Sequence, residues 1–191
     1  PLTSWGHDWV VLCLIIVHPF WAPTKVVALP IAARLYRNRQ GLNKGKKSIA
    51  IDLGSPQGRE IAQRLAAAPG ADAGLFVTNF PADGFLSYEE LRKLRDDLIC
   101  VRVMGWADGS QGMDYTINSA LGLPLMTGPV GDERPVNHVL AAWDLLTGAW
   151  CAFAMVSALL DRHRTGRGRE IRAPLSDIAA ATMTNLGFTA E

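Results

Sequence analysis

Three short apolar runs, separated by segments with helix-start signals, constrain the fold of this chain more than any other feature. The runs are Ser48–Leu53, Ala73–Thr78 and Leu98–Met104. Each has the length of a buried strand, and proline, serine or glycine residues separate them. Strand, helix, strand, helix and strand at this spacing predict right-handed crossovers and a parallel sheet. The expected fold is therefore a doubly wound, Rossmann-like α/β fold.

Capping residues mark the expected helix boundaries. Ser55 followed by Pro56 is typical of an N-cap with proline at the first helical position, and predicts a helix to about Ala67. Ser87–Glu90 has the pattern of a capping box for a short helix that ends near Arg95. The sequence also predicts a small helical segment near 117–125, a strand at Glu170–Ala173 and a closing helix from about Leu175 to Leu186.

The first 40 residues show no clear period, apart from Val10–Val17, which suits a buried strand. The apolar run Trp9–Val17 has nine residues. A transmembrane helix needs roughly 20. No basic segment precedes the run, as it would in a signal peptide. The sequence therefore predicts that the chain has no membrane partner.

Composition argues against several other classes of protein. With 191 residues, 49% of them hydrophobic, the chain can form one sizeable core. The net charge of +1 gives no electrostatic case for nucleic acid as a partner. Cys13, Cys100 and Cys151 are scattered, which argues against a disulfide framework or a zinc site and favours a reducing cytoplasm. No other metal-ligand cluster stands out.

The longest expected helix, Leu145–His163, begins directly after an aspartate and ends before the glycine-rich stretch Thr165–Gly168. Asp144 therefore lies at or beside a helix N-terminus, where free N–H groups and the helix dipole favour an ionised carboxylate. One interpretation is a simple N-cap, and the residues alone favour it. The other is a nucleophilic carboxylate, desolvated on one side by Trp143 and directed at an activated acyl group.

Two further candidate segments follow predicted strands. In open α/β sheets, ligands bind beyond the carboxyl ends of the strands. The segments are Ile51-Asp52-Leu53-Gly54 and Asn79-Phe80-Pro81. Asn79 offers an amide group and Phe80 a stacking face for a base, although an Asn-Phe-Pro turn is more often only structural.

The basic segments Gly41–Lys47 and Arg162–Arg169 could contact phosphates, but neither has the spacing of a P-loop or of a dinucleotide fingerprint. A solvated loop and a helix C-terminus explain them equally well. His138 lies six residues before Asp144 and cannot share a helical face with it. It becomes a candidate substrate-binding residue only if the intervening segment turns back.

Five blocks of the sequence carry a family resemblance. They are Asn43–Leu53, Ser55–Glu60, Thr78–Phe80, Ala142–Gly148 and Arg164–Glu170. In this order and at this spacing they resemble the class III CoA-transferases, the CaiB/BaiF family. The resemblance implies that residues 41–191 form the Rossmann-like large domain in the N-terminal half of such an enzyme, with its downstream half absent. Residues 1–40 form a separate segment that matches poorly.

The family's chemistry is covalent. By resemblance, Asp144 attacks an acyl-CoA thioester and carries CoA as an aspartyl thioester, while backbone N–H groups near the helix start stabilise the oxyanions. Ile51 to Gly54 and Asn79 to Pro81 would contact CoA, and Asp114 and Tyr115 would line the approach to Asp144. No metal or tightly bound cofactor is required, since CoA enters as part of the substrate. Family members form interlocked homodimers.

A narrower resemblance lies in Met113–Asn118 and in Pro135–Leu140 followed by Trp143-Asp144. These segments are similar to family members that move CoA between the two carboxylates of one C5 dicarboxylic acid. Alternatives are another acyl-CoA:carboxylate CoA-transferase, or an inactive fragment with a binding or scaffolding role. A racemase of the same family ranks lower, because Met113 stands where a proton-relaying histidine is expected. A dinucleotide-dependent oxidoreductase is opposed by the missing glycine fingerprint.

Overall fold

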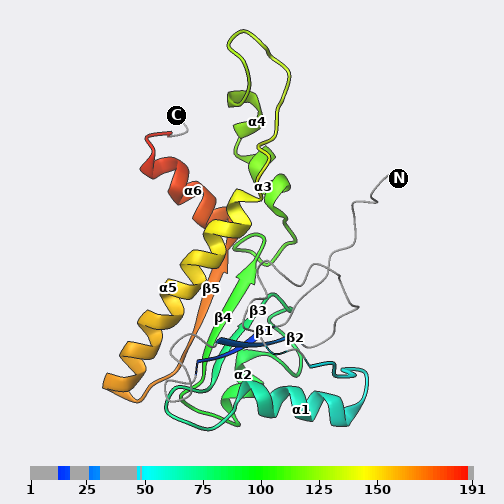
Figure 1. The fold of residues 1–191 in the computed structure, drawn as a ribbon, viewed down its shortest axis with the longest axis vertical. Coiled ribbons are helices and arrows are strands. Elements are labelled where there is room, and N and C mark those ends of the chain that lie inside the picture. Colours follow the sequence, from blue (N-terminus) through cyan, green and yellow to red (C-terminus); the bar gives the residue numbers. More distant parts are fainter. Residues whose placement is uncertain (1–12, 18–25, 31–46, 48, 189–191) are drawn as a thin grey trace.

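The computed structural model describes residues 13–17, 26–30, 47 and 49–188, and its centre is a five-stranded sheet. Its strands are β1 (Cys13–Val17), β2 (Val26–Pro30), β3 (Leu75–Thr78), β4 (Ile99–Met104) and β5 (Arg169–Pro174), in the order β2-β1-β3-β4-β5. Strands β3, β4 and β5 are parallel, whereas β1 is antiparallel to both β2 and β3 (Figure 1). The predicted parallel sheet is therefore confirmed for three strands.

Helices cover both faces of the parallel strands. Residues alternate along each strand, so that Phe76 and Cys100 face α1 (Pro56–Ala66) and α2 (Tyr88–Arg92). The neighbouring positions Leu75 and Ile99 pack on α5 (Ala142–Thr165). The last helix, α6 (Leu175–Asn185), packs beside α5 (Figure 1). This two-sided arrangement confirms the doubly wound α/β prediction.

The capping signals at two helices are confirmed. The Ser55 hydroxyl accepts the N–H of Gly58 at 3.0 Å, and Pro56 opens α1. Helix α5 ends at Gly166, which has a φ of 71° and so adopts the left-handed conformation that glycine favours. At the predicted capping box, the Ser87 hydroxyl accepts the N–H of Glu90, and α2 then ends at Arg92, three residues earlier than expected.

The predicted strand at Ser48–Leu53 is wrong. Residues 49–52 have no regular structure and 53–55 form a turn, while residue 48 lies outside the described residues. The edge of β3 that a parallel strand from this segment would need is occupied by β1, with Cys13 opposite Val77 and Leu14 opposite Phe76. The alternating apolar side chains of Ile49, Ile51 and Leu53 still pack against the α1 side of the core. The alternation of apolar residues in this segment therefore reflects burial of one side of the segment, and not hydrogen-bonded pairing in the sheet.

The other differences concern short elements. The helix expected near 117–125 is two helices, α3 (Asp114–Ala120) and α4 (Leu123–Met126), because Gly122 between them has a φ of 74°. Strand β2 was not predicted. The expected strand Val10–Val17 is seen over the described residues of β1, and the boundary between residues 1–40 and 41–191 stays a prediction.

Helix α5 is held at its C-terminal end by a buried arginine. The Arg162 side chain, 3% exposed, donates to the carbonyl oxygens of Ala71 at 2.6 Å and Asp97 at 3.2 Å. These carbonyls lie in the loops before β3 and β4. Arg162 is thus a structural residue. For this member of the basic segment Arg162–Arg169, a phosphate contact is not needed to explain the positive charge.

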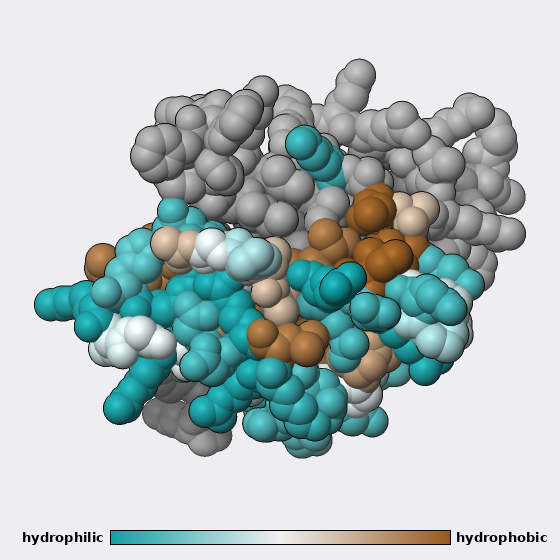
Figure 2. Space-filling model, turned by 90° about the horizontal axis from the view of Figure 1, so that it is seen from below, coloured by the Kyte–Doolittle hydropathy of each residue, from teal (hydrophilic) through white to brown (hydrophobic). Residues whose placement is uncertain are grey.

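Helix α5 has 24 residues and, by length and composition alone, is apolar enough to cross a membrane. Core helices of soluble proteins satisfy the same criterion, and one face of α5 packs on the sheet through Cys151, Met155 and Ala158. Its other face carries exposed apolar side chains, among them Trp150, Phe153, Val156 and Leu160. Seen from the end that carries α1, the described residues are mainly hydrophilic, with hydrophobic patches among them (Figure 2).

The contact between Gly58 and the preceding turn makes a stability prediction. A Cβ atom on Gly58 would lie 1.8 Å from the backbone oxygen of Asp52, which cannot move without breaking the turn. We expect Gly58→Ala to lower the free energy of unfolding by about 1–3 kcal/mol. Gly148→Ala is the matched control, because it lies within α5 with open space around its Cβ position, and it should raise stability by about 0.5–1 kcal/mol. Equal effects in urea denaturation would contradict the prediction.

Candidate active site

The start of α5 is capped by a carboxylate from another helix. Asp114, the first residue of α3, is 3% exposed, and its Oδ2 accepts the backbone N–H groups of Trp143 at 2.6 Å and Asp144 at 3.1 Å. Two first-turn donors of α5 are thereby satisfied from outside the helix. Asp114 was expected to line the approach to Asp144. The structure shows that it holds the backbone of Asp144 itself.

Asp144 is therefore not the N-cap of α5, and the simpler interpretation of this residue is wrong. The N-cap position is Ala141, and Asp144 lies in the first turn with its side chain exposed. Partial desolvation, and secondly the negative charge of Asp114, raise the pKa of the Asp144 carboxyl above its usual range. The expectation that free N–H groups hold this carboxylate ionised is not met, since Asp114 occupies those of Trp143 and Asp144. The same two N–H groups cannot serve as oxyanion donors.

Asn118, one turn after Asp114 on α3, fixes the surroundings of this helix start. It is fully buried, and its side-chain oxygen accepts the indole N–H of Trp143 at 3.2 Å. Its amide nitrogen donates to the side-chain oxygen of Asn137 at 2.7 Å. The segment before α5 is thus tied back onto α3. The spacing Asp114-x-x-x-Asn118, with both residues on one helical face, is a signal that could have indicated this role.

That tie brings His138 into the site, as the sequence required for it to be a candidate. His138 Nε2 lies 3.6 Å from Asp114 Oδ1. Its ring centroid is 6.1 Å from those of Tyr115 and Trp143. Four of the predicted site residues, Asp114, Tyr115, His138 and Asp144, therefore gather at the start of α5.

The predicted CoA-contacting segments lie in the same α/β body but make no hydrogen bond to α3 or to the start of α5 among the described residues. Asp52 accepts the N–H of Gly54 at 2.9 Å, so Ile51, Asp52, Leu53 and Gly54 form the turn before α1. Phe80 packs half-buried against the α1 side of the core, while Asn79 and Pro81 are exposed. Their contact with CoA stays a prediction.

Arg102 positions the second segment and was missed by sequence reasoning. It lies in β4, is 1% exposed, and donates from Nη1 to the carbonyl oxygens of Phe80 and Pro81, each at 2.8 Å. Its Nε donates to Glu170 of β5 at 3.0 Å. Burial raises the pKa of the Glu170 carboxyl, but hydrogen bonds from Arg102 and Arg172 outweigh it and lower the pKa overall. A single arginine inside an apolar strand gave no pattern that could predict this role.

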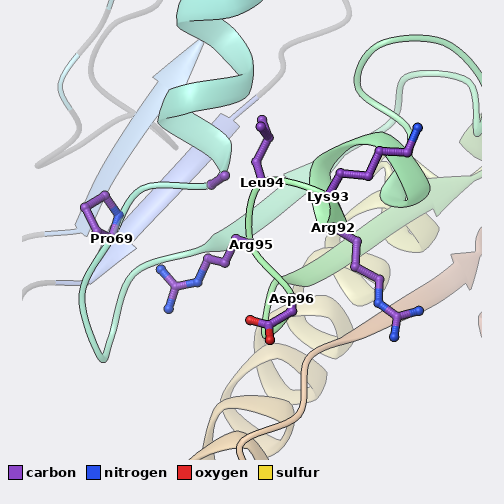
Figure 3. Close-up of a pocket in the computed structure, with 7 residues that line it drawn as sticks. Pro69, Arg92, Lys93, Leu94, Arg95 and Asp96 are labelled. Atoms are coloured by element: carbon purple, nitrogen blue, oxygen red, sulfur yellow. The ribbon is translucent and has the colours of Figure 1, made fainter.

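A shallow hollow on the surface does not belong to this site. It is lined by Ala67, Pro69 and residues 92–96, including Arg92, Lys93 and Arg95 (Figure 3). These residues precede β4, so the hollow lies at the amino end of that strand. Asp114 follows the carboxyl end of the same strand. The basic loop Gly41–Lys47 lies outside the described residues except for Lys47, which is exposed.

No group of three or more metal-ligating side chains gathers within the described ranges. Two of the cysteines, Cys100 and Cys151, are also poor nucleophiles. Burial raises the pKa of Cys100 to about 12 and that of Cys151 to about 11, so both stay protonated thiols at neutral pH. Among the described residues, Asp144 is the exposed carboxylate at this helix start that combines a raised pKa with freedom from capping.

Replacing Asp144 with asparagine should stabilise the fold at neutral pH. Because its folded-state pKa is raised, the folded state binds the proton more tightly than the unfolded chain, and ionisation lowers stability as the pH rises. The gain from Asp144→Asn should therefore be absent near about pH 3 and present at about pH 7. Melting temperatures at both values measure it. Asp177→Asn, in the first turn of α6, is the control that should not share the gain, since a first-turn carboxylate normally stabilises its helix.

The sheet, its two helical layers and the helix start beyond the strand ends define a doubly wound α/β protein whose candidate site is a carboxylate. The model of CoA-transferase family III matches residues 33–190. The chain therefore belongs to CoA-transferase family III, as the resemblance predicted.

Individual relatives agree with the family assignment. The chain is 51% identical over 151 residues to the 2-methylfumaryl-CoA isomerase of Chloroflexus aurantiacus, with 79% of this chain and 37% of the relative covered. It is 32% identical over 152 residues to the succinate–glutarate CoA-transferase of Agrobacterium fabrum, with 75% and 37% covered. A CAIB/BAIF family protein from Brucella suis matches in structure with a TM-score of 0.67 and 30% identity, covering 75% of this chain and 39% of that one. The chain spans little more than a third of the length of these relatives.

Proposed function

We propose that this protein transfers CoA between carboxylates through a thioester on Asp144. The observation that carries the proposal is that one carboxylate caps α5 while another, in its first turn, is left free. Asp114 satisfies the first-turn N–H groups, which leaves the exposed Asp144 carboxylate free of any capping role. Its raised pKa also makes it a better nucleophile than an ordinary surface aspartate once ionised.

The proposed reaction proceeds through balanced acyl-transfer steps. A carboxylate oxygen of Asp144 attacks the thioester carbonyl, and the C–S bond breaks. CoA leaves as a thiolate, and a mixed anhydride between Asp144 and the acyl group remains. The thiolate then attacks the aspartyl carbonyl, which gives an enzyme–CoA thioester and releases the first carboxylate. A second carboxylate attacks this thioester, and the same two steps in reverse form the new acyl-CoA and regenerate Asp144. No redox change or metal enters the sequence.

The specific substrate we propose is mesaconyl-CoA (2-methylfumaryl-CoA), with CoA moving from C1 to C4 of the same C5 diacid. The support is the 51% identity to a 2-methylfumaryl-CoA isomerase, against 32% to a succinate–glutarate CoA-transferase. In this reaction donor and acceptor carboxylates belong to one molecule. The free acid then need not leave the site between the two halves of the reaction.

The test uses the full-length product of the reading frame that contains these residues, incubated with C1-mesaconyl-CoA and ¹³C-labelled free mesaconate. Intramolecular transfer should give the C4 isomer without label, as measured by liquid chromatography and mass spectrometry. Label in the product would instead support an intermolecular acyl-CoA:carboxylate CoA-transferase. Absence of any product, with no CoA bound covalently to the enzyme, would reject both.

A second candidate is an inactive polypeptide with a binding role, motivated by the short span of this chain relative to its matches. It predicts that the 191-residue chain itself retains CoA without turnover, or does not fold stably.

We further propose that the active form is an interlocked homodimer in the cytoplasm. The exposed apolar face of α5 supports an additional packing partner, and light scattering of the full-length protein tests the dimer.

A further inference from the structure

His138 and Asp114 face one another with an unused hydrogen-bonding capacity. Asp114 Oδ1 and His138 Nε2 are both buried, 3.6 Å apart, and neither has a hydrogen-bond partner among the described residues. The other oxygen of Asp114 is committed to the start of α5. A buried carboxylate oxygen without a donor is costly, so this arrangement is stable only if a donor or a positive charge completes it.

The orientation of the imidazole leaves its second nitrogen available. Of the two ring nitrogens, Nε2 is the buried one, and the side chain as a whole is 25% exposed. Tyr115 and Trp143 flank the ring with interplanar angles of 56° and 65°. When both nitrogens carry protons, Nε2–H can donate to Asp114 while Nδ1–H points to the accessible side.

Charge balance gives this arrangement a function. Asp114 and Asp144 are close enough for the charge of one to perturb the other. A dicarboxylic acyl group would bring a third negative charge into the same space. In the described part of the chain, His138 is the basic side chain that contacts Asp114. An imidazolium there would offset the buried charge and still offer a donor to an incoming carboxylate.

A purely structural role for His138 is less consistent with these contacts. The segment that precedes α5 is already fixed to α3 by the hydrogen bond between Asn137 and Asn118. His138 makes no hydrogen bond among the described residues, so its position beside Asp114 is not needed to hold the loop.

We propose that His138 is a specificity-determining residue that, when its imidazole is protonated against Asp114, binds the free carboxylate of a dicarboxylyl-CoA beside Asp144. This inference rests on the proposed CoA transfer and names the group that selects its substrate class. A monocarboxylic acyl-CoA of similar length makes no such contact. It should therefore react independently of His138.

The experiment measures formation of the enzyme–CoA adduct by mass spectrometry in single turnovers of the full-length protein. Mesaconyl-CoA and crotonyl-CoA serve as the dicarboxylic and monocarboxylic probes. H138Q should raise the half-saturating concentration of mesaconyl-CoA by about 10–100-fold, the loss expected for one charged hydrogen bond, and leave that of crotonyl-CoA within about twofold. H138K, which keeps a positive charge, should restore part of the preference.

His163 provides the matched control. It also faces an aspartate, with Nε2 3.2 Å from Asp72 Oδ1, but at the other end of α5. H163Q should leave both probes unchanged. H138N removes the same charge with a smaller side chain, so the selectivity can be measured in whichever neutral variant retains the wild-type melting behaviour.

The outcomes separate the two proposals. An adduct in the wild-type protein, with equal losses for both probes or no loss in H138Q and H138N, overturns the role of His138 and leaves CoA transfer standing. No adduct with either probe in the wild-type protein overturns CoA transfer, and the role of His138 with it.

Discussion

The Asp144→Asn variant of the full-length protein should lose CoA transfer, by about 10³-fold or more, while remaining folded. Removal of a covalent nucleophile leaves only binding and orientation to accelerate the reaction, which accounts for losses of this order in other covalent enzymes. The amide has nearly the same shape as the carboxylate and can still occupy the first turn of α5. The loss would therefore report chemistry and not a disrupted helix.

Two measurements make this result specific. In the wild-type protein, hydroxylamine should trap the aspartyl thioester, and peptide mass spectrometry should place the modification on Asp144. Asp177→Asn, an exposed first-turn aspartate of α6, should keep both activity and adduct. An adduct on another residue, or one that survives in Asp144→Asn, would disprove the assignment of the nucleophile.

Arg102→Met should lower the free energy of unfolding by about 3–5 kcal/mol, a larger loss than that expected for Gly58→Ala. The change removes a guanidinium that is 1% exposed and leaves Glu170, whose side chain is 16% exposed, without its buried partner. It also leaves the carbonyl oxygens of Phe80 and Pro81 without their donor. Chemical denaturation monitored by tryptophan fluorescence measures the effect.

A surface pair supplies the comparison. Arg134 pairs with Asp132 at 2.6 Å but is 86% exposed, so Arg134→Met should leave the free energy of unfolding nearly unchanged. If Arg102 is important through its pair with Glu170, the double variant Arg102→Met with Glu170→Gln should recover part of the loss. Equal effects of Arg102→Met and Arg134→Met would show that burial of the pair does not matter.

The parts of the fold that the sequence predicted are those fixed by local chemistry. Ser55 and Pro56 begin a helix because their own backbone preferences require it, and Gly166 ends one for the same reason. The apolar runs at Leu75–Thr78 and Ile99–Met104 are buried on both faces and could form little else. Ser48–Leu53 failed because alternation reports which side chains are buried. It does not report whether an edge of the sheet is free.

The site shows the same division. The sequence placed Asp144 at a helix start, and the family resemblance singled it out as the nucleophile, which stays a prediction. What the sequence could not supply was the origin of the cap. A carboxylate thirty residues away replaces the local one, and only tertiary structure brings Asp114 to the N–H of Asp144. Nor could spacing along the chain show that His138 folds back toward Asp114.

Helix α5 is fastened at both ends, by Asp114 at its start and by Arg162 near its finish. Each added residue turns an α-helix by about 100° and lengthens it by about 1.5 Å. A single insertion or deletion between these two contacts would therefore rotate Asp144 away from Asp114, or move Arg162 away from the carbonyl oxygens to which it donates. The number of residues between Asp144 and Arg162 is therefore constrained by these two contacts. The exposed side chains of this helix can vary in sequence more freely than the helix can vary in length.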